Sequence, residues 1–235
     1  MTAKRTAEVS KVGLLASYFI PEAAHYLTVP PSTLRSWVVG RSYPTGEGPR
    51  DFLPPIEIAD PKRRMLSFIN LVEIHVLSAI RREHVVPLYR IRRAIDYLTK
   101  RFDSRHPLAT YGFETDGLDL FVTEVGSLIN ASREGQMAMR ELLSAHLRRI
   151  DWEKGVAARL YPFTRKEASD EPRVVVIDPR IAFGRPVLVG TGIPTGIIAE
   201  RVKAGETIQD LAKDYGRDPS EIEEAVRCEL HPQAA

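Results

Sequence analysis

Short polar side chains and one arginine follow a proline at the start of an expected helix. Pro31 suits the first turn of a helix. The residues exposed after it would be Ser32, Thr33, Arg35 and Ser36. Hydroxyl and guanidinium groups donate to phosphate oxygens and base edges, and none of these side chains adds negative charge. The segment therefore predicts a recognition helix that reads the major groove of double-stranded DNA.

Further residues beyond this helix could hold flanking phosphates. They lie in and after RSYPTGEGPRDFLPP, which contains too many turn formers for a helix and is typical of a wing. These residues are Arg41, Tyr43, Arg50, Lys62, Arg63 and Arg64. Residues 1–101 carry 16 Lys and Arg against 9 Asp and Glu, so this part of the chain favours a polyanionic partner.

The element that must position these side chains is a helix-turn-helix. Ala24 is the small residue at which two helices can touch, and Thr28 marks the turn. Leu34 and Trp37 stand ten and thirteen positions after Ala24, where they would pin the second helix across the first. We expect Trp37 to lie in the core rather than on the DNA-reading face.

A second unit with the same offsets lies near the C-terminal end. Its small contact is Ala212, its turn is at Gly216, and its pinning residues are Ile222 and Ala225. Residues 206–235 carry only 3 Lys and Arg against 8 Asp and Glu, a balance that repels phosphate. We therefore expect a protein contact here, made by acidic residues or by an arginine that enters a carboxylate-lined site of the partner. The candidates are Arg185, Arg201, Glu221, Glu223 and Glu224.

The pattern as a whole predicts an α+β fold that is mostly helical, in three parts. Residues 15–101 are a winged helix-turn-helix, 108–165 a middle module and 172–230 a C-terminal helix-turn-helix, with linkers at 102–110 and in FTRKEASDEPR. The middle module is expected to be a small β-meander that turns at Asp116-Gly117, followed by a helix. Beyond the wing, alternating Ile56 and Ile58 indicate a short strand, as do Leu66 and Phe68, and Asn70 is expected to cap the next helix.

Several classes of protein fit the composition poorly. The only cysteine, Cys228, excludes an intramolecular disulfide and a cysteine-based zinc site. We expect no cofactor, metal or catalytic group, because no nucleophile with its base, no His pair at metal spacing and no phosphate loop is found. The sequence has no apolar run long enough for a bilayer and no convincing signal-peptide cleavage site, so we expect a cytoplasmic protein.

Two family resemblances now become specific. YFIPEAAHYLTVPPSTLRSWVVG, with its wing and the later NLVEIHVLSAIRR and RIRRAIDYL, resembles the MerR-like winged helix-turn-helix that opens one group of VapB-type antitoxins. VVVIDPRIAFGRPVLVGTGIPTGIIAERVKAGETIQDLAKDYGRDPSEIEEAV is similar to a small helix-turn-helix family catalogued as a domain of unknown function and frequent in antitoxins. Together the two resemblances cover roughly 140 positions and leave the middle module without a match.

The resemblance implies a homodimeric antitoxin of a type II system that binds its own operator and neutralises a PIN-domain ribonuclease. Such a nuclease needs clustered carboxylates for divalent metal. The nearest candidates, Asp116, Asp119 and Glu124, are explained by turn chemistry, so the chain is interpreted as the inhibitor. Two alternatives remain open. One is a MerR-like regulator whose residues 118–160 sense a small molecule, and the other is an interaction adaptor that does not bind DNA.

Overall fold

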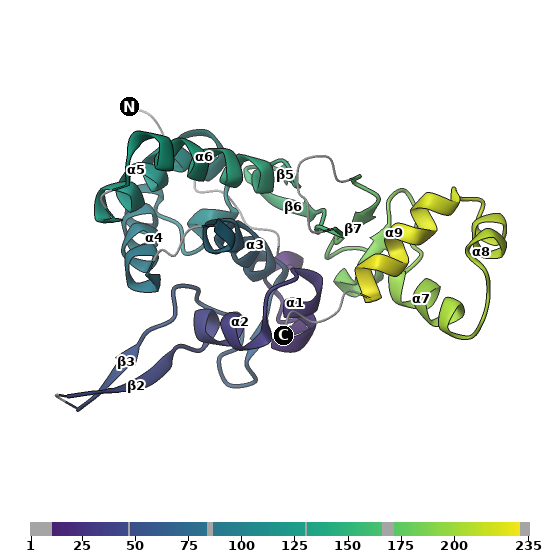
Figure 1. The fold of residues 1–235 in the computed structure, drawn as a ribbon, viewed down its shortest axis with the longest axis horizontal. Coiled ribbons are helices and arrows are strands. Elements are labelled where there is room, and N and C mark those ends of the chain that lie inside the picture. Colours follow the sequence, from purple (N-terminus) through teal and green to yellow (C-terminus); the bar gives the residue numbers. More distant parts are fainter. Residues whose placement is uncertain (1–10, 47, 84–86, 130, 166–171, 231–235) are drawn as a thin grey trace.

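The computed structural model describes residues 11–46, 48–83, 87–129, 131–165 and 172–230, and within these the side chains of 43–45, 49, 50, 81–83, 128 and 129 are not described. Helices dominate, as predicted (Figure 1). They are α1 (Ile20–Tyr26), α2 (Pro31–Val38), α3 (Phe68–Glu83), α4 (Leu88–Phe102), α5 (Leu118–Ile129), α6 (Arg133–Leu147), α7 (Thr195–Lys203), α8 (Ile208–Tyr215) and α9 (Pro219–Leu230).

The strands form antiparallel pairs that are distributed along the chain. They are β1 (Tyr18–Phe19) with β4 (Met65–Leu66), β2 (Arg41–Thr45) with β3 (Gly48–Phe52), β5 (Ile150–Glu153) with β6 (Val156–Leu160), and β7 (Val175–Val176) with β8 (Val187–Leu188). Short helical turns complete the described structure, namely η1 (Val12–Leu14), η2 (Pro107–Ala109), η3 (Phe113–Gly117) and η4 (Ala182–Gly184). The α+β class, with a helix-turn-helix near each end, is confirmed.

Helix α3 is the centre of the main hydrophobic core. From Phe68 to Ile80 its side chains are buried on every face, which is the pattern of a helix enclosed by other elements. Figure 1 shows α1 and α2 on one side of α3 and α5 and α6 on the other. The same buried cluster runs from Tyr18 to Ile177, so the N-terminal and middle segments share one core. The proposed boundary between them is therefore not marked by a gap in packing.

The start of α3 differs from the expectation in one detail. Ser67, not Asn70, caps the helix, because the Ser67 hydroxyl accepts the amide of Asn70 at 3.2 Å. The Asn70 side chain returns the interaction by accepting the Ser67 amide at 3.0 Å. This reciprocal pair has the arrangement of a capping box, with Asn in the place usually taken by Glu or Gln. Phe68 was predicted to be in a strand and is instead the first helical residue.

The wing is the hairpin of β2 and β3, and it projects from the helical body at the end opposite α8 (Figure 1). It lies wholly within the turn-rich segment that predicted it. Pro44 pairs with Pro49 across the hairpin. Ile56 and Ile58, predicted to continue as a strand, lie in irregular but buried chain instead.

The predicted β-meander of the middle module is wrong. Residues 113–129 form the π-helical turn η3 and helix α5, with Asp116-Gly117 inside the turn. The hairpin of this region lies later in the chain, at β5 and β6. The expected linker at 102–110 is also wrong, because Leu108 and Ala109 are fully packed in the core. The second expected linker has residues 166–171 outside the described residues, and its start is packed rather than exposed.

The C-terminal helices enclose a smaller core of their own. Their segment joins the main body through backbone pairing between Leu160 and Ile177 and through the side chain of Tyr18. The Tyr18 hydroxyl donates to the Gly184 carbonyl at 2.8 Å, and burial raises the pKa of Tyr18 well above its usual value. A phenol held this way acts only as a neutral donor. The contact joins the first strand of the chain to the C-terminal segment.

A second tie at this junction centres on Asp178, which is 1% exposed. Its carboxylate accepts from the Arg180 guanidinium at 2.7 Å and from Arg159 at 3.1 Å. Burial by itself raises the pKa of this carboxyl, but the hydrogen bonds and charges of the two arginines more than compensate and hold the pKa below its usual value. The ionised form is therefore the one that stabilises the junction.

This arrangement makes the junction sensitive to acid. A carboxyl whose pKa is lowered by folding contributes fully above its unfolded pKa, near 3.8, and loses that contribution as pH falls through the folded value. We expect Asp178→Asn to lower the free energy of unfolding by about 2 kcal/mol at pH 7 and by less at pH 3. Urea denaturation at the two pH values measures the difference. Asp119→Asn, on an exposed ion pair with Arg140, is the control, and an equal loss at both pH values would contradict the assignment.

Candidate nucleic-acid interface

The first helix-turn-helix has the geometry that its spacing predicted. Helix α1 ends at Tyr26, and Thr28 reverses the chain in the left-handed conformation, with φ +51°. Ala24, Leu34 and Trp37 are buried at 2%, 0% and 1% exposure, so α2 is fixed against α1 by the three predicted residues. Trp37 lies in the core, as expected. The opposite face of α2 is consequently available to a ligand.

This exposed face of α2 carries the residues that were predicted to contact DNA bases, which are called the reading residues below. Ser32 and Arg35 are exposed, and Thr33 and Ser36 are half-buried. The Ser36 hydroxyl donates to the Thr33 carbonyl at 2.7 Å, so its proton is engaged within the helix. Ser36 can still accept a hydrogen bond, whereas Ser32 and Arg35 are placed to donate. The side chains of α2 that are best placed to donate hydrogen bonds to a ligand are therefore Ser32 and Arg35.

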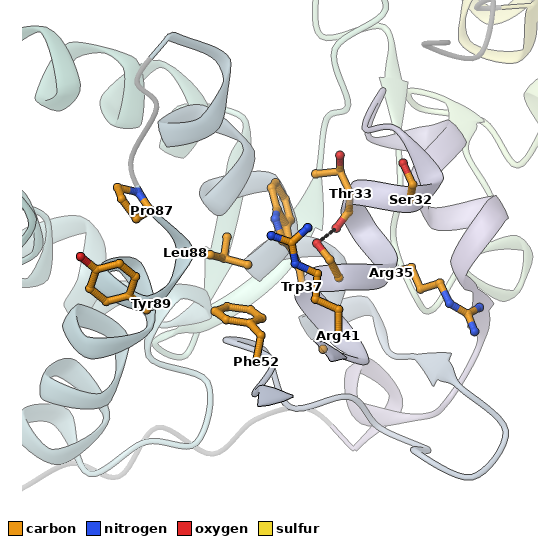
Figure 2. Close-up of a pocket in the computed structure, with 11 residues that line it drawn as sticks. Ser32, Thr33, Arg35, Trp37, Arg41, Phe52, Pro87, Leu88 and Tyr89 are labelled. Atoms are coloured by element: carbon orange, nitrogen blue, oxygen red, sulfur yellow. Dashed lines mark hydrogen bonds between the residues drawn. The ribbon is translucent and has the colours of Figure 1, made fainter. Parts of the chain in front are cut away.

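The reading residues line one open cleft of about 580 Å³, between α2, the base of the wing and the start of α4 (Figure 2). Polar side chains line it mainly from α2 and the first residue of the wing, and Pro87, Leu88 and Tyr89 line it from the α4 side. Its lining comprises Ser32, Thr33, Arg35, Ser36, Trp37, Gly40, Arg41, Phe52, Pro87, Leu88 and Tyr89. Four predicted residues of α2 and one of the wing therefore share one surface.

The wing is held to α2 by a tight turn at Gly40. Its φ is +79°, and a Cβ at this position would stand 2.3 Å from the Phe52 carbonyl oxygen. Only glycine allows this close approach of two backbone segments. The register Arg41 with Phe52 begins immediately afterwards, so Arg41 enters the cleft from the first residue of the wing.

The other predicted wing and loop residues have different outcomes. Tyr43 and Arg50 face each other in the hairpin register, but their side chains lie outside the described residues. Lys62, Arg63 and Arg64 are exposed and do not line the cleft, and Arg63 pairs with Asp60 at 3.9 Å. The structure therefore does not bring these three together with the recognition helix at the cleft.

The N-terminal end of α4 is a part of the cleft that the sequence reasoning missed. Tyr89 is 59% exposed, and the Arg90 guanidinium lies 5.5 Å from its ring centroid while its Nε donates to the Tyr89 hydroxyl at 2.8 Å. Such a pair presents an aromatic face and a cation to the same ligand. The sequence contains one indication of this pair, because Pro87 precedes a helix whose first turn includes Tyr89 and Arg90.

Of the two arginines proposed for a protein partner, only one is available. Arg201 is engaged by Asp214 at 2.7 Å and by Glu206, and it lies 5.0 Å from the Tyr215 ring centroid. Arg185 is exposed and has no ion pair with any residue that the structure describes. Arg185 is therefore the better candidate for a contact with another protein.

The acidic face of α9 is smaller than expected. Glu224 is 2% exposed, so its assignment to an exposed partner surface is wrong. It accepts hydrogen bonds from Thr164 and Arg165 and from Arg227 at 2.6 Å. Glu221 and Glu223, by contrast, are not buried, although each pairs with an arginine four positions away in the sequence, Arg217 and Arg227 respectively.

The second helix-turn-helix packs against the first. His25 of α1 lies 3.8 Å from the carboxylate of Glu229 on α9, and Thr195 donates to the same carboxylate. Burial by itself raises the pKa of the Glu229 carboxyl, but His25 and the hydrogen bond from Thr195 lower it by more, so the pKa lies below its usual value. Ala212, Ile222 and the other predicted packing residues of this unit are buried, as is Cys228.

Metal-binding clusters and membrane-spanning helices are both absent from the described part of the chain. No group of three His, Cys, Asp or Glu side chains is arranged to hold a metal ion there. No helix among these residues combines the length and the apolarity needed to cross a bilayer.

Comparison with known proteins agrees with the two-ended organisation. Residues 4–95 match a family described as "Putative DNA-binding HTH domain", and residues 175–227 match one described as "Protein of unknown function (DUF433)". The chain is 30% identical over 226 residues to "Putative antitoxin VapB45" of Mycobacterium tuberculosis (strain ATCC 25618 / H37Rv), which covers 89% of this chain and 92% of that relative.

Two further likenesses extend over most of the chain. "Uncharacterized protein Rv2308" of the same organism is 29% identical over 226 residues, which is 89% of this chain and 88% of the relative. The X-ray crystal structure of Rv2018 from M. tuberculosis superposes with a TM-score of 0.65 at 26% identity, covering 91% of this chain and 98% of that one. The similarity therefore includes the middle module as well as both ends.

Proposed function

This chain belongs to the family of the putative antitoxin VapB45, and from that premise we propose that it is the antitoxin of a type II toxin–antitoxin system, which binds its own operator as a homodimer. The observation that carries the DNA-binding part is the cleft at α2, the wing and α4. Ser32, Thr33, Arg35 and Ser36 read base edges in the major groove, and Arg41 contacts the backbone. Tyr43, Arg50, Lys62, Arg63 and Arg64 add phosphate contacts on either side.

Operator binding by a homodimer follows from the size of the reading surface. One α2 helix of eight residues spans too few base pairs for a specific site. A two-fold dimer presents two such helices to a palindromic operator. The number of base pairs contacted doubles, although the DNA-contacting surface of each copy is unchanged. This geometry is the basis for proposing autorepression of the chain's own gene.

We expect Arg35→Ala combined with Ser36→Ala to weaken binding to the upstream DNA about tenfold. The reason is the loss of one arginine contact and one hydroxyl acceptor from the middle of the recognition helix. A gel-shift titration at several salt concentrations measures the change. Arg133→Ala, an exposed arginine on α6, is the matched control and should bind as the wild type does. Unchanged affinity and salt slope in the double variant would remove this assignment.

The second part of the proposal is neutralisation of a PIN-domain ribonuclease by the C-terminal segment. A PIN nuclease holds divalent metal on clustered carboxylates, which an arginine can engage through two parallel hydrogen bonds. Arg185 supports this role because it is exposed and unpaired among the described residues. Glu223 is exposed and Glu221 is half-buried, and in this proposal both contact a basic RNA-binding surface of the nuclease.

A further inference from the structure

The turn before Arg185 holds an aromatic side chain in solvent. Phe183 is 95% exposed, which is the highest value among the exposed large hydrophobic residues of the described structure. Aromatic side chains normally bury a large area in a core or an interface, and this phenyl ring buries almost none. A ring that stays in water contributes nothing to folding, so its position needs a reason outside the stability of this chain.

The backbone at this ring is also unusual. Ala182, Phe183 and Gly184 have φ values of +47°, +57° and +79°, so three consecutive residues adopt the left-handed conformation. Residues with a side chain, and bulky ones above all, avoid this region. Such a conformation persists only where the surroundings fix it, and it is found more often at functional sites than elsewhere.

Both ends of the turn are fixed. Before it, the buried Asp178 carboxylate accepts the Arg180 amide at 2.9 Å and its guanidinium at 2.7 Å. After it, the Gly184 carbonyl accepts the Tyr18 hydroxyl, and a Cβ at Gly184 would stand 2.1 Å from the Tyr18 oxygen. The ring is therefore presented by a backbone that needs little further ordering when a partner binds, and such preorganisation increases affinity.

The chemistry beside the ring indicates what it fits. Arg185 follows two positions later, exposed and without an ion pair to any described residue. Aromatic and arginine side chains together are the residue types that dominate binding energy in protein interfaces. We propose that Phe183 is the anchor by which this chain holds its toxin, filling an apolar pocket whose rim carries carboxylates for Arg185. This inference rests on the toxin-binding part of the proposed function.

A second copy of this chain fits the turn less well. In a two-fold contact centred on this turn, the Arg185 side chains of the two copies would lie close together. Their guanidinium groups would repel each other in an interface that excludes water. A head-to-tail contact between copies would produce a ring or an open chain of molecules, and neither is the two-fold dimer proposed for operator binding. A different protein with negative charge around an apolar pocket avoids both problems.

The test uses full-length chain with Phe183→Asn and Phe183→Tyr, titrated calorimetrically with the purified product of the adjacent gene. Asn tolerates the left-handed conformation, so Phe183→Asn should leave the fold intact and raise the Tm by about 2 °C. We expect it to weaken binding about 30-fold, whereas Phe183→Tyr, which keeps the ring, should bind within about threefold of the wild type. Met137→Ser, which removes an exposed apolar side chain on α6, is the control.

The outcomes are separable. Binding by Phe183→Asn within twofold of the wild type would overturn the anchor while leaving the toxin-binding proposal in place. Failure of the wild-type chain to bind the gene product would overturn both. Sedimentation velocity provides the remaining arm: a variant that binds the gene product normally but dissociates from dimer to monomer would assign Phe183 to self-association, and the anchor would be wrong.

Discussion

Trp37→Ala should lower the free energy of unfolding by about 4 kcal/mol, because it removes a fully packed indole from the contact between the two helices of the DNA-binding unit. The side chain is 1% exposed and lies in the core with Leu34 and Ala24. The turn at Thr28 limits how far the two helices can move together to close the space. For a chain of this length the Tm should fall by roughly 10 °C.

Thermal and urea unfolding measure this effect, and a gel shift at a temperature where the variant remains folded measures its consequence for operator binding. Tyr97→Ala is the matched control, because Tyr97 is 43% exposed on α4 and its removal should change stability by less than about 0.5 kcal/mol. If Trp37→Ala were as stable as the control, Trp37 would not be the residue that fixes α2 to α1. A role on the DNA-contacting face would then replace its assignment to the core.

Gly40→Ala should displace the wing and cost about 3 kcal/mol of stability. The new methyl group would stand 2.3 Å from the Phe52 carbonyl oxygen, which belongs to the backbone and cannot rotate away. The φ of +79° adds strain for any residue with a Cβ. Because β2 begins at Arg41, relief of the clash must move the first residue of the wing and open the cleft.

We expect Gly40→Ala to bind operator DNA more weakly than its unfolded fraction alone would explain. A gel shift measures the affinity, and denaturation of the same preparation measures the unfolded fraction. Gly46→Ala is the matched control, since the new methyl group at the wing tip meets nothing within 4 Å and the φ of Gly46 lies outside the left-handed region. Equal operator affinity in the two alanine variants would show that the wing does not contribute to DNA binding.

The packing of both helix-turn-helix units was predictable because it depends on local spacing. A small residue, a turn, and apolar residues ten and thirteen positions later require two short helices to cross, whatever surrounds them. The same locality explains the wing, whose prolines and glycines restrict the backbone directly. Because Leu34 and Trp37 could be assigned to the buried face of α2, the remaining residues of the helix could be assigned to its exposed face.

The middle module was predicted wrongly because two periodicities compete in it. Leu118, Leu120 and Val122 alternate as in a strand, but Leu118, Phe121, Val122 and Val125 also have the spacing of one helical face. The second set is the one that is buried, so the helical period is the one that determines the structure. The Asp-Gly pair favoured a hairpin turn and misled the interpretation.

Other features depended on contacts between distant parts of the chain. Glu224 looked like an exposed helix carboxylate, and only its contacts with Thr164 and Arg165, some sixty residues earlier, place it in the interior. The contribution of Tyr89 to the cleft likewise needs the path of α3, which brings the start of α4 back to α2. No local pattern contains either contact.

The pairing of Pro44 with Pro49 has a consequence for the behaviour of the molecule at high concentration. Neither residue has an amide hydrogen, so neither strand has a donor to offer another chain at this level of the hairpin. A protruding two-stranded ribbon is otherwise a template on which another chain can add a strand. The two prolines interrupt both outer edges at the same level, which protects the wing against edge-to-edge aggregation.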